Sequence, residues 1–266
     1  MVRARREIVA VGSEDDAMYK KDRMFASPME RVSDFDFGEA TAEVFNDMLV
    51  RSVPFYEEVQ HMIVDLALKF TRDGSVVCDL GCSTGTTLRM LLAKLGRTSP
   101  STDTIRLIGV DSSQPMLDRA RATLASSHSG HQITWELRDL NEGILGLAAD
   151  VFIMNLTLQF VRPLYREQLI SSIYHSTTSG GCLILVEKVL ADDTLFSRLC
   201  IDMYHEFKKR KGYSEMEIAQ KREAIENILI PYRVSENLQM LKSSGFGHVE
   251  AFFRWFNFAG FIAIKN

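Results

Sequence analysis

The sequence predicts an α/β fold, in which a mostly parallel sheet is covered by helices on both faces. Short apolar runs alternate with stretches of helical periodicity between residues 75 and 189, an order typical of parallel strands joined by crossover helices. The strand runs are apolar throughout, which indicates burial on both faces. Two final apolar runs at 248–257 and 258–266 predict an antiparallel hairpin at the sheet edge. Seven strands are expected in total.

Five of these strands belong to the alternating part of the chain. Its helices have recognisable ends: Pro115 falls in the first turn of a helix over 113–127, and Gly96 is predicted to be the C-cap of a helix over 86–96. A third helix is expected at 165–176. The expected strands are 75–81, 106–111, 133–140, 150–160 and 180–189.

The flanking segments differ from this alternation. Residues 1–20 mix arginines with acidic residues and hold no long apolar run, so we expect a flexible extension and not a signal peptide. Apolar residues three or four apart predict helices across 35–71, interrupted near Pro54. Residues 192–242 are also typical of helices and are expected to form an insertion after the fifth strand. We therefore expect one domain over 21–266.

Composition narrows the function class. The 266 residues carry a net charge of −4, which argues against a general affinity for nucleic acid. The longest apolar runs, such as 182–186, are far too short to cross a membrane. Four cysteines at 78, 82, 182 and 200 form no CxxC pair and no metal-ligand spacing. A cytoplasmic protein with reduced thiols and no metal is expected.

A glycine-containing loop after the first strand gives the strongest chemical signal. In VVCDLGCSTGTT (76–87) the strand ends at Asp79, and Gly81 and Gly85 follow before a helix begins. Small residues let the backbone approach a ligand closely at the carboxyl end of a strand. The dinucleotide pattern G-x-G-x-x-G is not met, because Ser83 stands between the glycines. The spacing resembles instead the first motif of class I enzymes that use S-adenosylmethionine (SAM).

Two acidic residues follow at the next strand ends. Asp111 ends the second strand, and because an ionised carboxylate only accepts hydrogen bonds, it can take both ribose hydroxyls of a nucleoside. Asp139 ends the third strand, where this class contacts adenine. The structural alternatives are a simple turn at the loop and capping of the next helix by Asp111. The order of the three signals favours SAM binding.

The fourth strand ends at Asn155, within DVFIMNLTLQF (150–160). Nucleic-acid amino-methyltransferases often have [ND]-P-P-[YF] here, and this chain does not. Asn155 is predicted either to contact the ligand or to stabilise the turn, and the sequence does not separate these alternatives.

Six blocks extend the similarity beyond the SAM motifs, from about residue 21 to the end of the chain. They are FASPMERVSDFDF (25–37), EVFNDMLVRSVPFY (43–56), DLGCSTG (79–85), IMNLTLQF (153–160), EFKKRKGYSEMEIAQKR (206–222) and FFRWFNFAGFIAIK (252–265). Together they resemble the carboxy-SAM synthase family, which serves the modification of wobble uridine in tRNA.

The resemblance implies a class I SAM-methyltransferase fold and a reaction of SAM with prephenate that gives carboxy-SAM and phenylpyruvate. In the implied route, prephenate loses carbon dioxide and aromatises as water leaves, and a sulfonium ylide captures the carbon dioxide. No residue is marked as the general base, a role that departing hydroxide can fill. A homodimer is implied, together with a functional link to a separate tRNA carboxymethyltransferase and no direct contact with nucleic acid or membrane.

The resemblance also implies ten ligand contacts. The family usually has Asn after the ribose-binding Asp, where this chain has Ser112, whose shorter side chain lacks the amide. Thr84, Thr86 and Thr87 also depart from the family's loop, although they are small enough to fit. The ten positions are Tyr56, Gly81, Cys82, Ser83, Asp111, Ser112, Asp139, Leu140, Asn155 and Arg222.

Arg222 and Tyr56 are the predicted catalytic residues. Carboxy-SAM carries a carboxylate beside the sulfonium, which Arg222 can hold by a charge-assisted pair and Tyr56 by a further hydrogen bond. Ser214 and Glu217 fit a capping box, so a helix should start there and direct Arg222 about two turns later.

Three functions remain open at this point: the synthase, a plain SAM-dependent methyltransferase, and a non-catalytic partner of the tRNA-modifying enzyme. A methyl-transferring site needs no cation facing the methyl group, so Arg222 separates the first two. The basic run 208–211 is either a phosphate or tRNA patch or a solvated helix end, and we favour the second. His205 is a further candidate for substrate contact.

Overall fold

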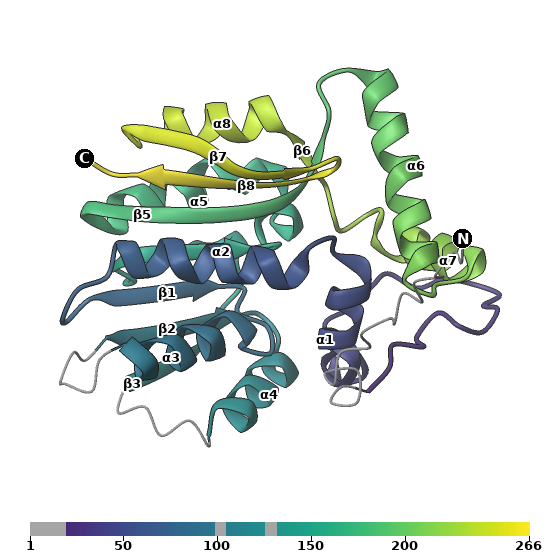
Figure 1. Ribbon diagram of the computed structural model, residues 1–266, viewed down its shortest axis with the longest axis horizontal. Coiled ribbons are helices and arrows are strands. Elements are labelled where there is room, and N and C mark those ends of the chain that lie inside the picture. The colour runs from purple at the N-terminus through teal and green to yellow at the C-terminus, as the bar shows by residue number, and fades with distance from the viewer. Residues whose placement is uncertain (1–19, 99–104, 126–131) are drawn as a thin grey trace, which may run out of the picture.

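The computed structural model describes residues 20–98, 105–125 and 132–266. Seven strands form one sheet in the order β3-β2-β1-β4-β5-β8-β7 (Figure 1), and the short β6 pairs with the end of β5. The first five strands are parallel to one another, and β8 runs antiparallel to both β5 and β7. The mixed sheet and its C-terminal hairpin confirm the fold class. The predicted extension over 1–20 lies almost wholly outside the described residues.

The element bounds follow the sequence pattern closely. The strands are β1 (Val76–Leu80), β2 (Arg106–Asp111), β3 (Gln132–Leu137), β4 (Ala149–Asn155), β5 (Thr177–Leu190), β6 (Tyr232–Arg233), β7 (His248–Trp255) and β8 (Phe258–Ile264). The helices are α1 (Glu39–Ser52), α2 (Tyr56–Lys69), α3 (Thr86–Thr98), α4 (Gln114–Leu124), α5 (Pro163–Ser176), α6 (Thr194–Arg210), α7 (Glu215–Ile225) and α8 (Val234–Ser243), with short 3₁₀ turns at Leu140–Glu142 and Leu158–Phe160.

Helices cover both faces of the sheet. On one face Ile63 of α2 packs with Val151 of β4, alongside α3 and α4. On the other face Ile173 of α5 and Leu241 of α8 pack with Phe152. Neighbouring residues of β4 thus enter opposite cores, as strand geometry requires, which explains why its sequence is apolar throughout.

Some predicted bounds need correction. The strands predicted over 133–140 and 150–160 end at Leu137 and Asn155, and a 3₁₀ turn follows β4 at Leu158–Phe160. Gly96 is not a C-cap, because α3 continues through it to Thr98; a single glycine inside a helix costs only about 1 kcal/mol relative to alanine. The helical pattern over 192–242 is interrupted by β6, and the last helix, α8, packs against the main sheet. The break near Pro54 is confirmed, since α1 ends at Ser52 and α2 begins at Tyr56.

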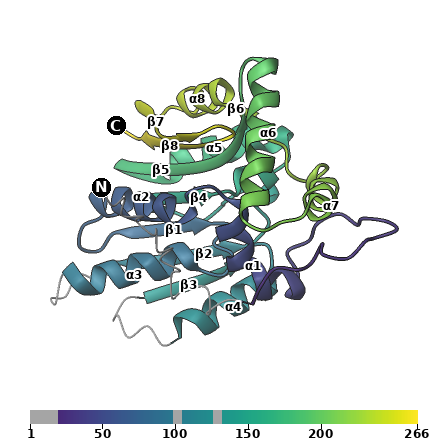
Figure 2. The same cartoon turned by 45° about the vertical axis from the view of Figure 1, so that its right-hand side comes forward.

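α1, α6 and α7 lie together at one end of the sheet (Figure 1; Figure 2). The segment over 20–37 runs past α7 and is bound to it by hydrogen bonds. Gln220 donates to the carbonyl of Phe25 at 2.9 Å, and the amide of Phe35 donates to the carbonyl of Ala224 at 2.8 Å. This segment and the three helices enclose the space beyond the strand ends. In the described part of the chain no helix is long and apolar enough to span a membrane.

Candidate active site

The glycine loop forms the floor of the site. The amides of Gly81 and Cys82 donate to the carbonyl of Val110 at 2.8 and 2.9 Å, which fixes the loop to the end of β2. Gly81 has φ +79°, and a Cβ there would lie 2.3 Å from the Thr157 hydroxyl. Glycine is therefore required both by conformation and by close packing. Thr84 donates to Asn46 of α1 at 2.8 Å, so one of the threonines that depart from the family pattern joins the loop to α1.

Asp111 binds this loop from the neighbouring strand. One carboxylate oxygen accepts from the amide of Ser83 at 2.8 Å, and the other accepts from the amide of Ser113 at 2.9 Å. The cap of α4 is Ser113 itself, whose hydroxyl accepts from the amide of Met116, so the capping alternative for Asp111 is wrong. A carboxylate has about four acceptor positions, so Asp111 keeps capacity to accept from a ribose hydroxyl.

The third and fourth strand ends complete the ligand side of the pocket. Asp139 lies two residues beyond β3 and accepts from the amide of Asn141 at 2.8 Å, which caps the turn that carries Leu140. The side-chain oxygen of Asn155 is buried and has no hydrogen-bond partner among the described residues. That oxygen does not stabilise the turn, so the geometry favours the ligand-contact alternative.

Tyr56 enters from the opposite side, at the first position of α2. It is buried, and its hydroxyl accepts from Gln60 at 2.9 Å, while Gln60 in turn accepts from Thr87 of α3 at 3.0 Å. The preceding Phe55 has φ +54°, a left-handed conformation that turns the chain sharply between α1 and α2.

A single pocket unites nine of the ten predicted contacts. Its lining includes Tyr56, Gly81, Cys82, Ser83, Asp111, Ser112, Asp139, Leu140 and Asn155. The residues come from five separate segments of the sequence, and the parallel topology places their strand ends along one edge of the sheet.

Arg222 does not line this pocket. It is exposed on α7 and faces a separate hollow shared with Asp202 and His205 of α6. The capping box is confirmed, since Ser214 accepts from the amide of Glu217 and α7 begins one residue after it. Consecutive helical residues are about 100° apart, so the inward residue of α7 is Lys221. The predicted contact between Arg222 and the ligand stays a prediction.

Sequence reasoning missed three lysines that line the pocket: Lys188, Lys208 and Lys221. The interpretation of 208–211 as a solvated helix end is wrong for Lys208, which is only 5% exposed. Lys208 follows the buried Tyr204 by one turn and so shares the inward face of α6. That spacing is the signal that could have identified it.

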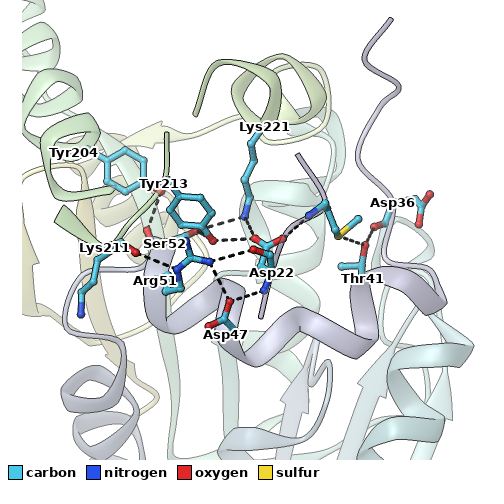
Figure 3. Close-up of polar contacts among 11 residues, drawn as sticks. Asp22, Asp36, Thr41, Asp47, Arg51, Ser52, Tyr204, Lys211, Tyr213 and Lys221 are labelled. Atoms are coloured by element: carbon cyan, nitrogen blue, oxygen red, sulfur yellow. Dashed lines mark hydrogen bonds and ion pairs between the residues drawn. The ribbon is translucent and has the colours of Figure 1, made fainter. Parts of the chain in front are cut away.

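A polar cluster beside the pocket joins α1, α7 and the segment over 20–37 (Figure 3). The ammonium of Lys221 lies 3.6 Å from the carboxylate of Asp22, which also accepts from the hydroxyl of Tyr213 at 2.8 Å. Arg51 pairs with Asp47 at 3.2 Å. The two cations of this cluster are thus matched by two carboxylates. Burial lowers the pKa of Lys221 to about 8.

The residues present fit SAM. Asp79 is buried at the end of β1, one of its carboxyl oxygens has no partner among the described residues, and burial raises its pKa to about 7. A cationic ligand on the loop directly above would favour the ionised carboxylate. The unpartnered oxygen of Asn155 lies on the pocket wall, where the nucleoside of SAM would supply a hydrogen-bond donor. Asp79 lies beneath the loop and does not line the pocket, so the positive charge of SAM would act on it through space.

Comparison with known proteins agrees with this geometry. Residues 78–183 match a family model described as a methyltransferase domain. Magnesium protoporphyrin IX methyltransferase from Synechocystis PCC 6803 superposes with a TM-score of 0.55 at 16% identity, over 82% of this chain and 87% of that one. An O-methyltransferase family protein from Burkholderia thailandensis gives 0.58 at 18% identity, over 89% and 65%. Such distant similarity shows the class I methyltransferase fold alone.

Curated relatives give a narrower assignment. A carboxy-S-adenosyl-L-methionine synthase from Methylococcus capsulatus is 47% identical over 245 residues, which are 92% of this chain and 99% of the relative. The chain belongs to the carboxy-SAM synthase family. A second synthase, from Nitratiruptor sp., is 44% identical over 93% of this chain and 99% of its own length. Membership of the carboxy-SAM synthase family confirms the resemblance carried by the six sequence blocks.

Proposed function

We propose that the protein converts SAM and prephenate to carboxy-SAM and phenylpyruvate, in the cytoplasm, and that residues 21–266 act as one catalytic domain. The relationship to named carboxy-SAM synthases over nearly the full length of both chains carries this proposal. The nine predicted contacts in one pocket support it. Four buried free cysteines are compatible with a reducing compartment.

The proposed reaction balances without a further reactant. Prephenate breaks one C–C bond to release carbon dioxide and one C–O bond to release hydroxide, and its ring becomes aromatic. The methyl carbon of SAM loses a proton and forms a C–C bond to the carbon dioxide, and proton and hydroxide leave as water. A pocket closed by α1, α6 and α7 would keep bulk water from reprotonating the methyl carbon.

Within this proposal Tyr56 donates a hydrogen bond to the transferred carboxylate, and Arg222 pairs with it. Arg222 lies outside the pocket of its own chain, so it can reach the carboxylate in two ways. Its side chain moves into that pocket, or it enters the pocket of a neighbouring copy. Mixing an Arg222 variant with a variant defective in the glycine loop tests this. Recovery of activity in the mixture would assign the arginine to the neighbour's pocket.

We further propose a homodimer formed through α6. Four apolar side chains on this helix are exposed in the single chain: Leu195, Phe196, Leu199 and Met203. An exposed apolar stripe of this kind marks an interaction surface, and it lies on the helical segment that follows β5.

The carboxy-SAM is proposed to serve a separate tRNA carboxymethyltransferase. SAM-dependent formation of phenylpyruvate from prephenate by the purified protein tests the proposal. Turnover would exclude the non-catalytic alternative, and methylation of a substrate without use of prephenate would favour the plain methyltransferase.

A further inference from the structure

We propose that Lys188 and Lys208 form a carboxylate-binding end of the pocket and hold the carboxylate that prephenate keeps, the one on its pyruvyl side chain. This assignment rests on the proposed function and adds a substrate-specificity site to it. None of the ten positions predicted from the sequence includes either lysine.

The two lysines converge on one aromatic ring. The ammonium of Lys188, from β5, lies 5.1 Å from the ring centre of Tyr204, and that of Lys208, from α6, lies 4.6 Å from it. The hydroxyl of Tyr204 donates to the carbonyl of Ser52 at 2.9 Å, which holds the ring in place. Tyr204 packs with Tyr56 in one buried cluster, so the lysines adjoin the predicted catalytic tyrosine.

The surrounding charges do not balance. Lys221 is paired with Asp22 and Arg51 with Asp47, whereas neither Lys188 nor Lys208 has a carboxylate within ion-pair distance among the described residues. Arg222 adds a further positive charge near Lys188, while burial together with Lys208 and Arg222 lowers the pKa of His205. Buried cations without an opposite charge are costly, so their presence on a pocket wall indicates an anionic ligand.

The lowered pKa values of the two lysines also support the assignment. It lowers the pKa of Lys188 to about 8, with a smaller effect from Arg222, and it lowers the pKa of Lys208 well below its ordinary value, with help from Lys221 and Lys188. Asp22 opposes the shift of Lys208 only in part. A bound carboxylate would restore the charged form of both lysines.

The chemistry selects which carboxylate is bound. The ring carboxylate of prephenate becomes neutral carbon dioxide, so a cation paired with it would stabilise the reactant more than the transition state. The pyruvyl carboxylate stays ionised in reactant, transition state and product. Holding that group gives uniform binding, which lowers KM and leaves kcat unchanged.

Steady-state kinetics with saturating SAM and varied prephenate test the assignment. We expect Lys188→Met and Lys208→Met each to raise KM for prephenate about tenfold or more, the loss typical of one charged hydrogen bond, with kcat within about threefold of wild type. The inhibition constant of phenylpyruvate should rise in parallel, and the Kd of SAM should not change. Lys208→Arg should retain near-normal KM, because it keeps the charge. Lys242→Met, an exposed lysine on α8, is the matched control.

An unchanged KM for prephenate in folded Lys188→Met and Lys208→Met would overturn the assignment, and so would a selective loss of kcat. A raised KM with unchanged phenylpyruvate inhibition would also overturn it, because the lysines would then bind the departing carboxylate. If Lys208→Met does not fold, Lys188→Met still decides. Wild-type protein that forms neither phenylpyruvate nor carboxy-SAM would instead contradict the proposed function.

Discussion

Asp79 and Asp111 end the adjacent strands β1 and β2, close enough for the charge of Asp111 to add to the effect of burial on Asp79. Together these two causes raise the pKa of Asp79 to about 7. The thiols of Cys78 and Cys82 beside them stay neutral, because burial raises the pKa of both well above the ordinary value. Asp79 is therefore a group at the loop whose pKa lies close to neutral pH, and burial raises the pKa of Asp111 as well.

This relationship predicts a pH dependence of SAM binding. SAM is cationic and favours ionised Asp79, so its affinity should be constant above pH 8 and fall as the pH is lowered through about 7, where free Asp79 takes up a proton. Calorimetric titration between pH 6 and 8.5 measures this. Asp79→Asn should bind SAM more weakly and without the pH dependence; an unchanged pH profile in that variant would assign the titration to another group.

The close packing of the glycine loop predicts that alanine at Gly81 and alanine at Gly74 affect SAM binding differently. Gly81→Ala introduces a Cβ within 2.3 Å of the Thr157 hydroxyl at a positive φ, whereas Gly74→Ala shares the positive φ but meets no atom within 4 Å. The left-handed conformation alone costs about 1–2 kcal/mol. Both variants should lose that stability in chemical denaturation, but only Gly81→Ala should lose SAM binding. Equal SAM affinity in the two would mean that the loop does not face the ligand.

The proposed role of Arg222 predicts that its loss weakens binding of carboxy-SAM far more than binding of SAM. Arg222→Ala should abolish retention of carboxy-SAM, because the charge-assisted pair to its carboxylate is lost, and should affect SAM binding much less. Mass spectrometry of ligands released from purified protein measures both. Equal loss of the two ligands would remove the role assigned to Arg222.

The exposed stripe on α6 predicts a change of assembly. Phe196 is 61% exposed in the single chain, and Phe196→Glu should convert a dimer into monomers because it places a charge in an apolar interface. Light scattering after size-exclusion chromatography measures the mass. Wild-type protein that is monomeric at all concentrations would refute the proposed dimer.

The fold and the SAM side of the site were predictable because local patterns encode them. The glycine loop and the strand-end positions of Asp111 and Asn155 are visible in a few consecutive residues, and parallel topology then brings them together. The capping box at Ser214 was equally local, and it correctly placed the start of α7. These features needed no knowledge of tertiary packing.

The other side of the pocket depends on contacts between distant segments. Lys208 and Lys209 are neighbours in one basic run, yet one lines the pocket and the other pairs with Glu206 and Glu215 at the surface. Only the packing of α6, which turns Tyr204 and Lys208 inward, distinguishes them. The same limit applies to α7, where the sequence singled out Arg222 and the fold turned Lys221 inward.

The most direct test is the mass of the nucleoside formed when the purified protein is incubated with SAM and prephenate. We expect an ion that corresponds to SAM with one methyl hydrogen replaced by a carboxyl group, in equal amount to phenylpyruvate. Omission of prephenate should abolish it. If only SAM or its demethylated product is found while prephenate remains unchanged, the protein is not a carboxy-SAM synthase.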